Sequence, residues 1–279
     1  MSYKLIVDSG CDLTTEMEKE MNISTIPFKI AVDDKEFIDD ENFNMDLFLD
    51  TMKNSSNPIK TSCPSPFDYE SEVEKASEDE IFILTISSKL SGSYNSANIA
   101  KNQILEKDPK KKVHVFDSKT ASAGETCIAL KINEFIKNGL GFDEIVEKTE
   151  KEIDKLKTFF ILENLDNLIK NGRIKKTAGL IANVLNIRPI MIGENGEISL
   201  FEMNRGFKKS LSKLADALGN VVDDIEDRTL VISHVNGLEK AEEFEKKVRS
   251  LYNFKDIKII HTKGLASGYA DNGGIVIAF

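Results

Sequence analysis

Two hydroxyl-rich loops are the segments of this sequence that could do chemistry. The first, KTSCPSPFDY (residues 60–69), places Thr61, Ser62 and Ser65 beside a thiol and two prolines, and the second is SSKLSGSYNSA (residues 87–97). Serine and threonine side chains that precede a helix commonly cap its free amides. Two such loops would also suit an anion, because helix N-termini and hydroxyl groups attract a carboxylate or a phosphate. A serine nucleophile is the third possibility.

Sequence motifs weaken the catalytic interpretation of these loops. Neither G-x-S-x-G nor S-x-x-K surrounds the loop serines, and the chain has no Walker loop and no G-x-G-x-x-G. His234 and His261, each at the end of an expected strand, would be the bases of a serine-dependent hydrolase. Cys11, Cys63 and Cys127 have no paired spacing and the histidines lie far apart, so we expect neither a disulfide framework nor a metal site.

The charge of the chain argues against nucleic acid as a partner. The formal net charge is −10, whereas binding to nucleic acid depends on neutralising phosphates. The basic segment RIKK (residues 173–176) is the exception and would suit the docking of an acidic partner. No apolar run approaches the roughly 20 residues of a membrane helix, and the start MSYKLIVDSG does not resemble a secretory signal. We therefore expect a cytoplasmic protein without a transmembrane segment.

The first half of the chain alternates strands with helices, which predicts an α/β fold with a mostly parallel, wound sheet. Its expected strands are residues 3–9, 24–32, 80–87 and 111–118. Because ligands bind beyond the carboxyl ends of such strands, Asp8-Ser9, Ser87-Ser88 and Asp117-Ser118 should lie at one crevice. The second half is predicted to be an α+β unit. We expect an N-terminal domain at residues 1–158 and a C-terminal domain at residues 159–279.

Six segments of the chain resemble the DegV family in order and spacing. They are VDSGCDL (7–13), TSCPS (61–65), SSKLSGSYNSA (87–97), FDSKTASAG (116–124), LIKNGRI (168–174) and NIRPIM (186–191). The resemblance extends over essentially the whole chain, so residues 3–278 are identified as one DegV module. It implies a two-domain α/β protein that binds one long-chain fatty acid in a buried tunnel and presents it to a separate fatty acid kinase.

The resemblance also implies roles for particular residues. Thr61 and Ser91 match the hydroxyl groups that hold the fatty-acid carboxylate, and their neighbours Ser62, Gly92 and Ser93 could assist. Arg173 matches an arginine near the tunnel mouth that is associated with kinase docking. The protein would then be a carrier without catalytic residues, and its only ligand would be the fatty acid, with no cofactor or metal.

The chain departs from the family pattern near its last strand. Where DegV proteins usually have a histidine that reaches the carboxylate, this chain has Tyr269, and Asp271 replaces a glycine. A tyrosine can donate a hydrogen bond but cannot become a cation, and a nearby aspartate would repel a carboxylate.

Apolar side chains must line such a tunnel, and the expected set is Phe28, Phe159, Phe160, Ile161, Leu165, Leu180, Leu185 and Ile190. Two other functions stay open at this point, a serine-dependent lipid or ester hydrolase and a regulator without a kinase partner.

Overall fold

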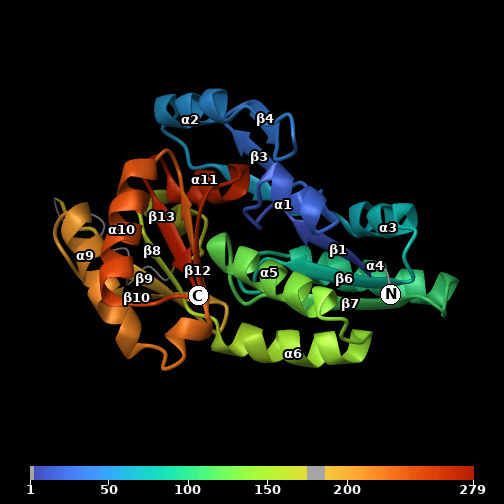
Figure 1. Cartoon of the computed structure of the whole chain (residues 1–279). Helices are drawn as coiled ribbons and strands as arrows, with labels where there is room; N and C mark the ends of the chain where they lie inside the picture. Colours follow the sequence, from blue (N-terminus) through green and yellow to red (C-terminus); the bar gives the residue numbers. More distant parts are fainter. Residues whose placement is uncertain (1–2, 175–185) are drawn as a thin grey trace.

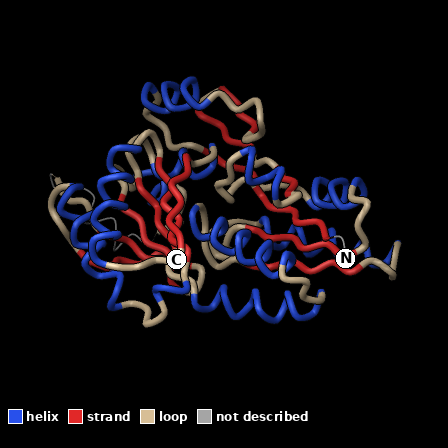
Figure 2. Tube along the Cα trace, viewed as in Figure 1, coloured by secondary structure: helices blue, strands red, loops and turns tan. Residues whose placement is uncertain are grey.

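The residues described below form three β-sheets with helices between and around them (Figures 1 and 2). A computed structural model describes residues 3–174 and 186–279. Leu180 and Leu185 of the expected tunnel, and Lys175 and Lys176 of the basic segment, lie outside these ranges. None of the described helices is long and apolar enough to cross a membrane.

The first sheet is parallel throughout and has the strand order β2-β1-β6-β7. Its strands are β1 (Tyr3–Asp8), β2 (Ile23–Ile26), β6 (Glu80–Thr85) and β7 (Lys112–Asp117). One face packs against α3 (Pro66–Lys75) and α4 (Ser93–Lys107), and the other against α1 (Thr15–Glu20), α5 (Ala123–Lys137) and α6 (Phe142–Lys155). Burial on both faces explains why β6, EIFILT, is apolar almost throughout. The wound α/β architecture predicted for this half is confirmed.

A small antiparallel sheet, β4-β3-β5, lies beside the first one together with α2 (Met45–Asn54). Its strands are β3 (Lys29–Val32), β4 (Lys35–Ile38) and β5 (Lys60–Ser62). The single strand expected over residues 24–32 is therefore wrong, because it divides into β2 and β3 at Pro27. Proline has no N–H for a ladder bond. The next N–H, that of Phe28, donates to Ser9 Oγ at 3.0 Å, and the chain passes from one sheet to the other.

The second large sheet has the order β10-β9-β8-β13-β11-β12 and is mixed, with only β11 and β12 parallel. Its strands are β8 (Thr158–Ile161), β9 (Ile190–Glu194), β10 (Glu197–Glu202), β11 (Thr229–His234), β12 (Asp256–His261) and β13 (Ile275–Ala278). This agrees with the α+β prediction. β8 begins at Thr158, so the boundary predicted between residues 158 and 159 falls at the start of this sheet. The division into two domains at this boundary stays a prediction.

Helix α5 packs between the two large sheets, as Figure 1 shows. Ile128 and Ile132 contact the core of the first sheet, whereas Ala123 and Cys127 pack with Val276 of the second. Helices α9 (Phe207–Ala217) and α10 (Leu238–Leu251) cover the far face of the second sheet. The short helices α7 (Asp166–Lys170) and α11 (Gly264–Ala270) pack on the other face of this sheet. Two 3₁₀ turns, Leu218–Asn220 and Ile225–Asp227, lie between α9 and β11 in the chain.

Candidate functional site

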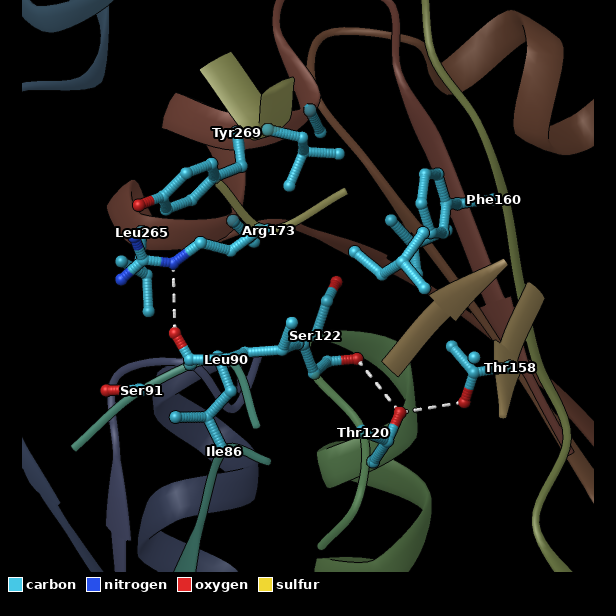
Figure 3. Close-up of a pocket in the computed structure, with 18 of the residues that line it drawn as sticks. Ile86, Leu90, Ser91, Thr120, Ser122, Thr158, Phe160, Arg173, Leu265 and Tyr269 are labelled. Atoms are coloured by element: carbon cyan, nitrogen blue, oxygen red, sulfur yellow. Dashed lines mark hydrogen bonds between the residues drawn. The ribbon is translucent and has the colours of Figure 1, made fainter. Parts of the chain in front are cut away.

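A mostly apolar cavity of about 190 Å³ is lined by residues of the small sheet, of the second large sheet and of the loops that follow the strands of the first sheet (Figure 3). Its apolar wall includes Phe28, Ile86, Leu90, Phe160, Leu162, Leu168, Leu265 and Val276. Glycines and small residues, among them Gly10, Ala121, Gly193 and Ala270, complete that wall. Both halves of the chain are therefore needed to form it.

Four polar side chains lie together at one end of this cavity, which we call the polar end (Thr61, Ser91, Arg173 and Tyr269). Thr61 Oγ1 and the Tyr269 hydroxyl share a hydrogen bond of 3.0 Å. Arg173 Nε donates to the carbonyl of Leu90 at 3.0 Å, directly before Ser91. In Figure 3, Tyr269, Arg173 and Ser91 lie on one side of the cavity and Phe160 and Thr158 on the other. The other side is mostly apolar, and two of its hydroxyl groups, those of Thr120 and Thr158, share a hydrogen bond of 2.8 Å with each other.

Strand β5 explains why Thr61 belongs to the site and its neighbour does not. Successive side chains of a strand point to opposite faces. Thr61, which pairs with Ile30, lines the cavity, whereas Ser62 is exposed and is not part of the cavity wall. Of the two adjacent hydroxyl groups in the first loop, only that of Thr61 is therefore available to a bound molecule.

The second loop uses its three central residues in different ways. Ser91 and Gly92 line the cavity just before α4 begins. Ser91 Oγ accepts the Ser93 N–H at 3.2 Å. Ser93 itself is fully buried, donates to Asp8 and shares a 2.6 Å hydrogen bond with the Tyr69 hydroxyl, so it supports the loop from behind.

Helix α7 connects the segments that carry Thr61 and Tyr269. Asn167 Oδ1 accepts the Ile59 N–H at 3.2 Å, and its Nδ2 donates to the Gly268 carbonyl at 2.9 Å. Asn171, one turn later, donates to the Ile59 carbonyl at 3.0 Å. Neither asparagine was predicted from the sequence, although their spacing of four residues places both on one helix face.

Asp39 fixes the start of α11, the helix that carries Tyr269. Its two carboxylate oxygens accept the N–H groups of Gly264 at 2.7 Å and Leu265 at 2.8 Å. Burial raises the pKa of Asp39, and the two backbone donors oppose that rise. The Asp39 carboxyl group thus satisfies amides that would otherwise be unpaired at a buried helix end.

A buried carboxylate, Asp8, lies behind the cavity wall at the carboxyl end of β1. It accepts the N–H groups of Gly10 and Ile86, both at 3.0 Å, and the Ser93 hydroxyl. Glu125 is fully buried, and its carboxyl group can hydrogen-bond to that of Asp8 when one of the two carries a proton. A Cβ added at Gly10 would lie 2.6 Å from Glu125 Oε1 and 2.9 Å from Asp8 Oδ1, so the two carboxyl groups face each other.

Burial raises the pKa of Asp8 to about 6. Burial, followed by the nearby charges of Asp8 and Asp12, raises the pKa of Glu125 well above its ordinary value. Two buried carboxylates at such short range are not both ionised. Of the two, Glu125 therefore holds its proton more tightly, and Asp8 is the member that ionises first and holds the loops.

The polar residues at the strand ends make hydrogen bonds within the protein and do not line the cavity. Ser88 donates its N–H to Asp117 Oδ1 at 3.0 Å, while Ser87 donates its hydroxyl to the Gly196 carbonyl at 2.8 Å. None of Asp8, Ser9, Ser87, Ser88, Asp117 and Ser118 lines the cavity; its wall uses neighbours such as Gly10, Ile86 and Lys119.

The histidines proposed as bases lie next to each other at the ends of β11 and β12. Their ring centroids are 5.1 Å apart. His234 Nδ1 accepts the Gly237 N–H at 3.3 Å, and burial lowers the pKa of His234. Within residues 3–174 and 186–279, no histidine is hydrogen-bonded to a loop serine, and no group of three or more histidine, cysteine or acidic side chains could hold a metal ion.

The expected tunnel residues divide between the two faces of the second sheet. Phe28 and Phe160 line the cavity. The core on the opposite face contains Phe159, Ile161 and Ile190, so their assignment to the tunnel is wrong. Successive side chains of a strand point to opposite faces, which explains why Phe160 lines the cavity and its neighbours do not. Leu165 is buried with Leu168 but does not line the cavity. Asp271, which would repel a carboxylate if it lay nearby, is also absent from the cavity wall.

Comparison with known proteins identifies the family of this fold and cavity. The model of the DegV family, described as uncharacterised proteins, matches residues 2–279. A DegV domain-containing protein of Streptococcus gordonii is 37% identical over 284 residues, covering 100% of this chain and 99% of the relative. The chain belongs to the DegV family.

Two solved structures that are similar to this chain contain a fatty acid. A DegV protein of Ruminococcus gnavus, refined with vaccenic acid, has a TM-score of 0.94 and 40% identity and is matched over 100% of both chains. The fatty acid kinase (Fak) B3 protein of Streptococcus pneumoniae, loaded with linoleic acid, has a TM-score of 0.91 and 35% identity, with 100% of this chain and 99% of that chain covered. DegV proteins similar to this one bind fatty acids.

Proposed function

We propose that this protein binds a long-chain fatty acid in the cavity, with the carboxylate at the polar end and the acyl chain along the apolar wall. The observation that carries the proposal is one mostly apolar cavity in which Thr61, Ser91, Arg173 and Tyr269 converge at one end. The fatty acids in the two similar structures support it. Ser62 and Ser93 take no direct part in this proposal.

Each part of a fatty acid has a physical counterpart in this cavity. Every buried methylene contributes about 0.8 kcal/mol, so the chain drives binding. The buried carboxylate needs hydrogen-bond donors, or its desolvation cancels much of that gain. If Tyr269 donates to Thr61 Oγ1, the Thr61 proton is free to point to the ligand. The Arg173 guanidinium has no carboxylate within 4 Å among the described residues, and it would supply the positive charge.

We further propose that the bound acid is presented to a separate fatty acid kinase, which phosphorylates its carboxylate. The name of the S. pneumoniae protein, fatty acid kinase B3, supports this role. A carrier needs no nucleophile of its own, in keeping with hydroxyl groups at the polar end that have no described histidine partner.

Denaturing mass spectrometry of organic extracts of the purified protein tests the binding proposal. We expect a long-chain fatty acid in about equimolar amount. Extracts without lipid, together with no binding of added oleic acid, would refute it. Labelling of Ser91 by a fluorophosphonate would instead support the hydrolase.

Tyr269→Phe is expected to weaken fatty-acid binding by about 1–2 kcal/mol, because one hydrogen bond to Thr61 is lost. Tyr269→His is expected to introduce a pH-dependent step in affinity between about pH 5.5 and 7.5, since imidazole gains a charge there and phenol does not. Isothermal titration of the wild type and both variants across this range, corrected for ionisation of the ligand, measures both effects. Full affinity in Tyr269→Phe would show that Tyr269 only packs at the cavity.

Arg173→Ala is expected to weaken fatty-acid binding by about 1.5–3 kcal/mol, because a charge-assisted donor leaves the cavity wall. The sequence predicted that Arg173 docks the kinase. In that case, Arg173→Ala would lower phosphorylation by an added kinase and leave fatty-acid affinity unchanged. Affinity and acyl-phosphate formation at saturating ligand, measured on the same variant, separate the two roles. Lys170→Ala, an exposed cation on the preceding helix, is the matched control. Unchanged affinity in Arg173→Ala would support docking alone.

A further inference from the structure

A glycine occupies the middle of the sheet face that forms the apolar wall. Gly193 of β9 pairs with Thr158 of β8 on one side and with Ile198 of β10 on the other. All three line the cavity, as does Phe160, two residues after Thr158 on the same face. This row therefore has a side chain from each neighbouring strand and none from β9.

The backbone at Gly193 does not require glycine. Its φ is not positive, in contrast to Gly196 at the following turn, where φ is +84°. A Cβ added at Gly193 would meet, among the described atoms, only Thr158 Cβ at 3.6 Å and Thr158 O at 3.9 Å, which are ordinary contacts. At Gly196 an added Cβ would lie 2.6 Å from Ser87 Oγ. Gly193 could thus carry a side chain, and the space left by its absence belongs to the cavity.

This space lies away from the polar end. Figure 3 places Thr158, the partner of Gly193, on the side opposite to Tyr269, Arg173 and Ser91. An acyl chain with its carboxylate at the polar end would extend in this direction. A glycine in a strand interior commonly marks a site where another molecule approaches the backbone closely.

We propose that Gly193 determines ligand length: the last carbons of a long acyl chain lie over its bare backbone, between Thr158 and Ile198. This inference rests on the proposed function and deepens it, because it assigns the end of the cavity that selects the chain. A side chain at residue 193 would displace those carbons, and each methylene displaced lowers affinity about fourfold.

Competition among lauric, myristic, palmitic and stearic acids for delipidated protein, read by mass spectrometry of the bound fraction, tests the inference. In Gly193→Leu, we expect the ratio of bound stearic to bound myristic acid to fall at least tenfold from wild type. The ratio in Gly193→Ala should lie between those of the wild type and of Gly193→Leu. Ile198→Ala should shift the ratio toward stearic acid. Ile192→Val, which alters the opposite face of β9, is the control and should leave the ratio unchanged.

The outcomes separate this inference from the function on which it rests. Wild-type protein that binds none of the four acids would overturn the proposed function itself. Wild-type binding with the same chain-length ratio in Gly193→Leu and Gly193→Ala would overturn only the role of Gly193. Thermal unfolding of each variant shows whether it is folded, and if Gly193→Leu is not, Gly193→Ala and Ile198→Ala still decide.

Discussion

Fatty-acid affinity is expected to fall by about 3–6 kcal/mol in the double variant Thr61→Val, Ser91→Ala, because each lost hydrogen bond to a carboxylate costs about 1.5–3 kcal/mol. Valine keeps the shape of Thr61, so the apolar wall is preserved. The carboxylate would then be buried with fewer donors, which adds to the loss. Isothermal titration with oleic acid, together with thermal unfolding of the ligand-free protein, separates lost binding from lost folding.

Ser62→Ala provides a matched control for the double variant. Ser62 is adjacent to Thr61 but exposed outside the cavity, so its removal should leave affinity at the wild-type level. Wild-type affinity in the double variant would show that Thr61 and Ser91 do not hold the carboxylate. Equal losses in the double variant and in Ser62→Ala would indicate a general disturbance of the loop.

Asp8→Ala is expected to lower the free energy of unfolding by about 3–5 kcal/mol, because the N–H groups of Gly10 and Ile86 and the Ser93 hydroxyl would be left buried without their acceptor. Chemical denaturation at pH 7 measures this change. Asp117→Ala, at the corresponding end of β7 but partly exposed, should cost less because water can replace it. Equal losses at both positions would contradict the special role of Asp8.

The same pair of carboxyl groups predicts how stability depends on pH. The pKa of Asp8 is raised to about 6, so the folded protein holds this proton more tightly than the unfolded chain does. The free energy of unfolding should therefore fall as the pH rises from about 4 to about 6. The raised pKa of Glu125 acts in the same direction. Glu125→Gln, which does not titrate, should show a shallower decline; a decline as steep as that of the wild type would exclude Glu125 as its source.

Local sequence patterns predicted the wound parallel sheet and both hydroxyl-rich loops, but they did not distinguish which hydroxyl groups face the cavity. Thr61 and Ser62 are equivalent as residue types, and only the alternation of β5 separates them. That strand pairs with β3, which was predicted as a continuation of β2. Ser93 resembled Ser91 in sequence, yet its partner is Asp8, far away in the chain.

Long-range contacts explain what the sequence did not predict. Asn167 and Asn171 support the site through Ile59 and Gly268, and no local motif marks those contacts. The motif predicted Arg173 at the tunnel mouth. Its position on the cavity wall depends on the hydrogen bond from its Nε to the Leu90 carbonyl, which is distant in sequence. Phe159 and Phe160 are adjacent in an apolar run, and their division between core and cavity depends on which face of the sheet is covered by α9 and α10.

The position of β13 has a consequence for biosynthesis. β13 is the last strand of its sheet in chain order, but it lies between β8 and β11 in the interior of that sheet. While the chain is still being translated, β8 and β11 cannot reach their final arrangement, because the strand that joins them has not left the ribosome. Tyr269 and Val276 of the cavity emerge at the same late stage. A nascent chain therefore acquires its ligand site only after residues 275–278 have emerged, in the same step that closes its largest sheet.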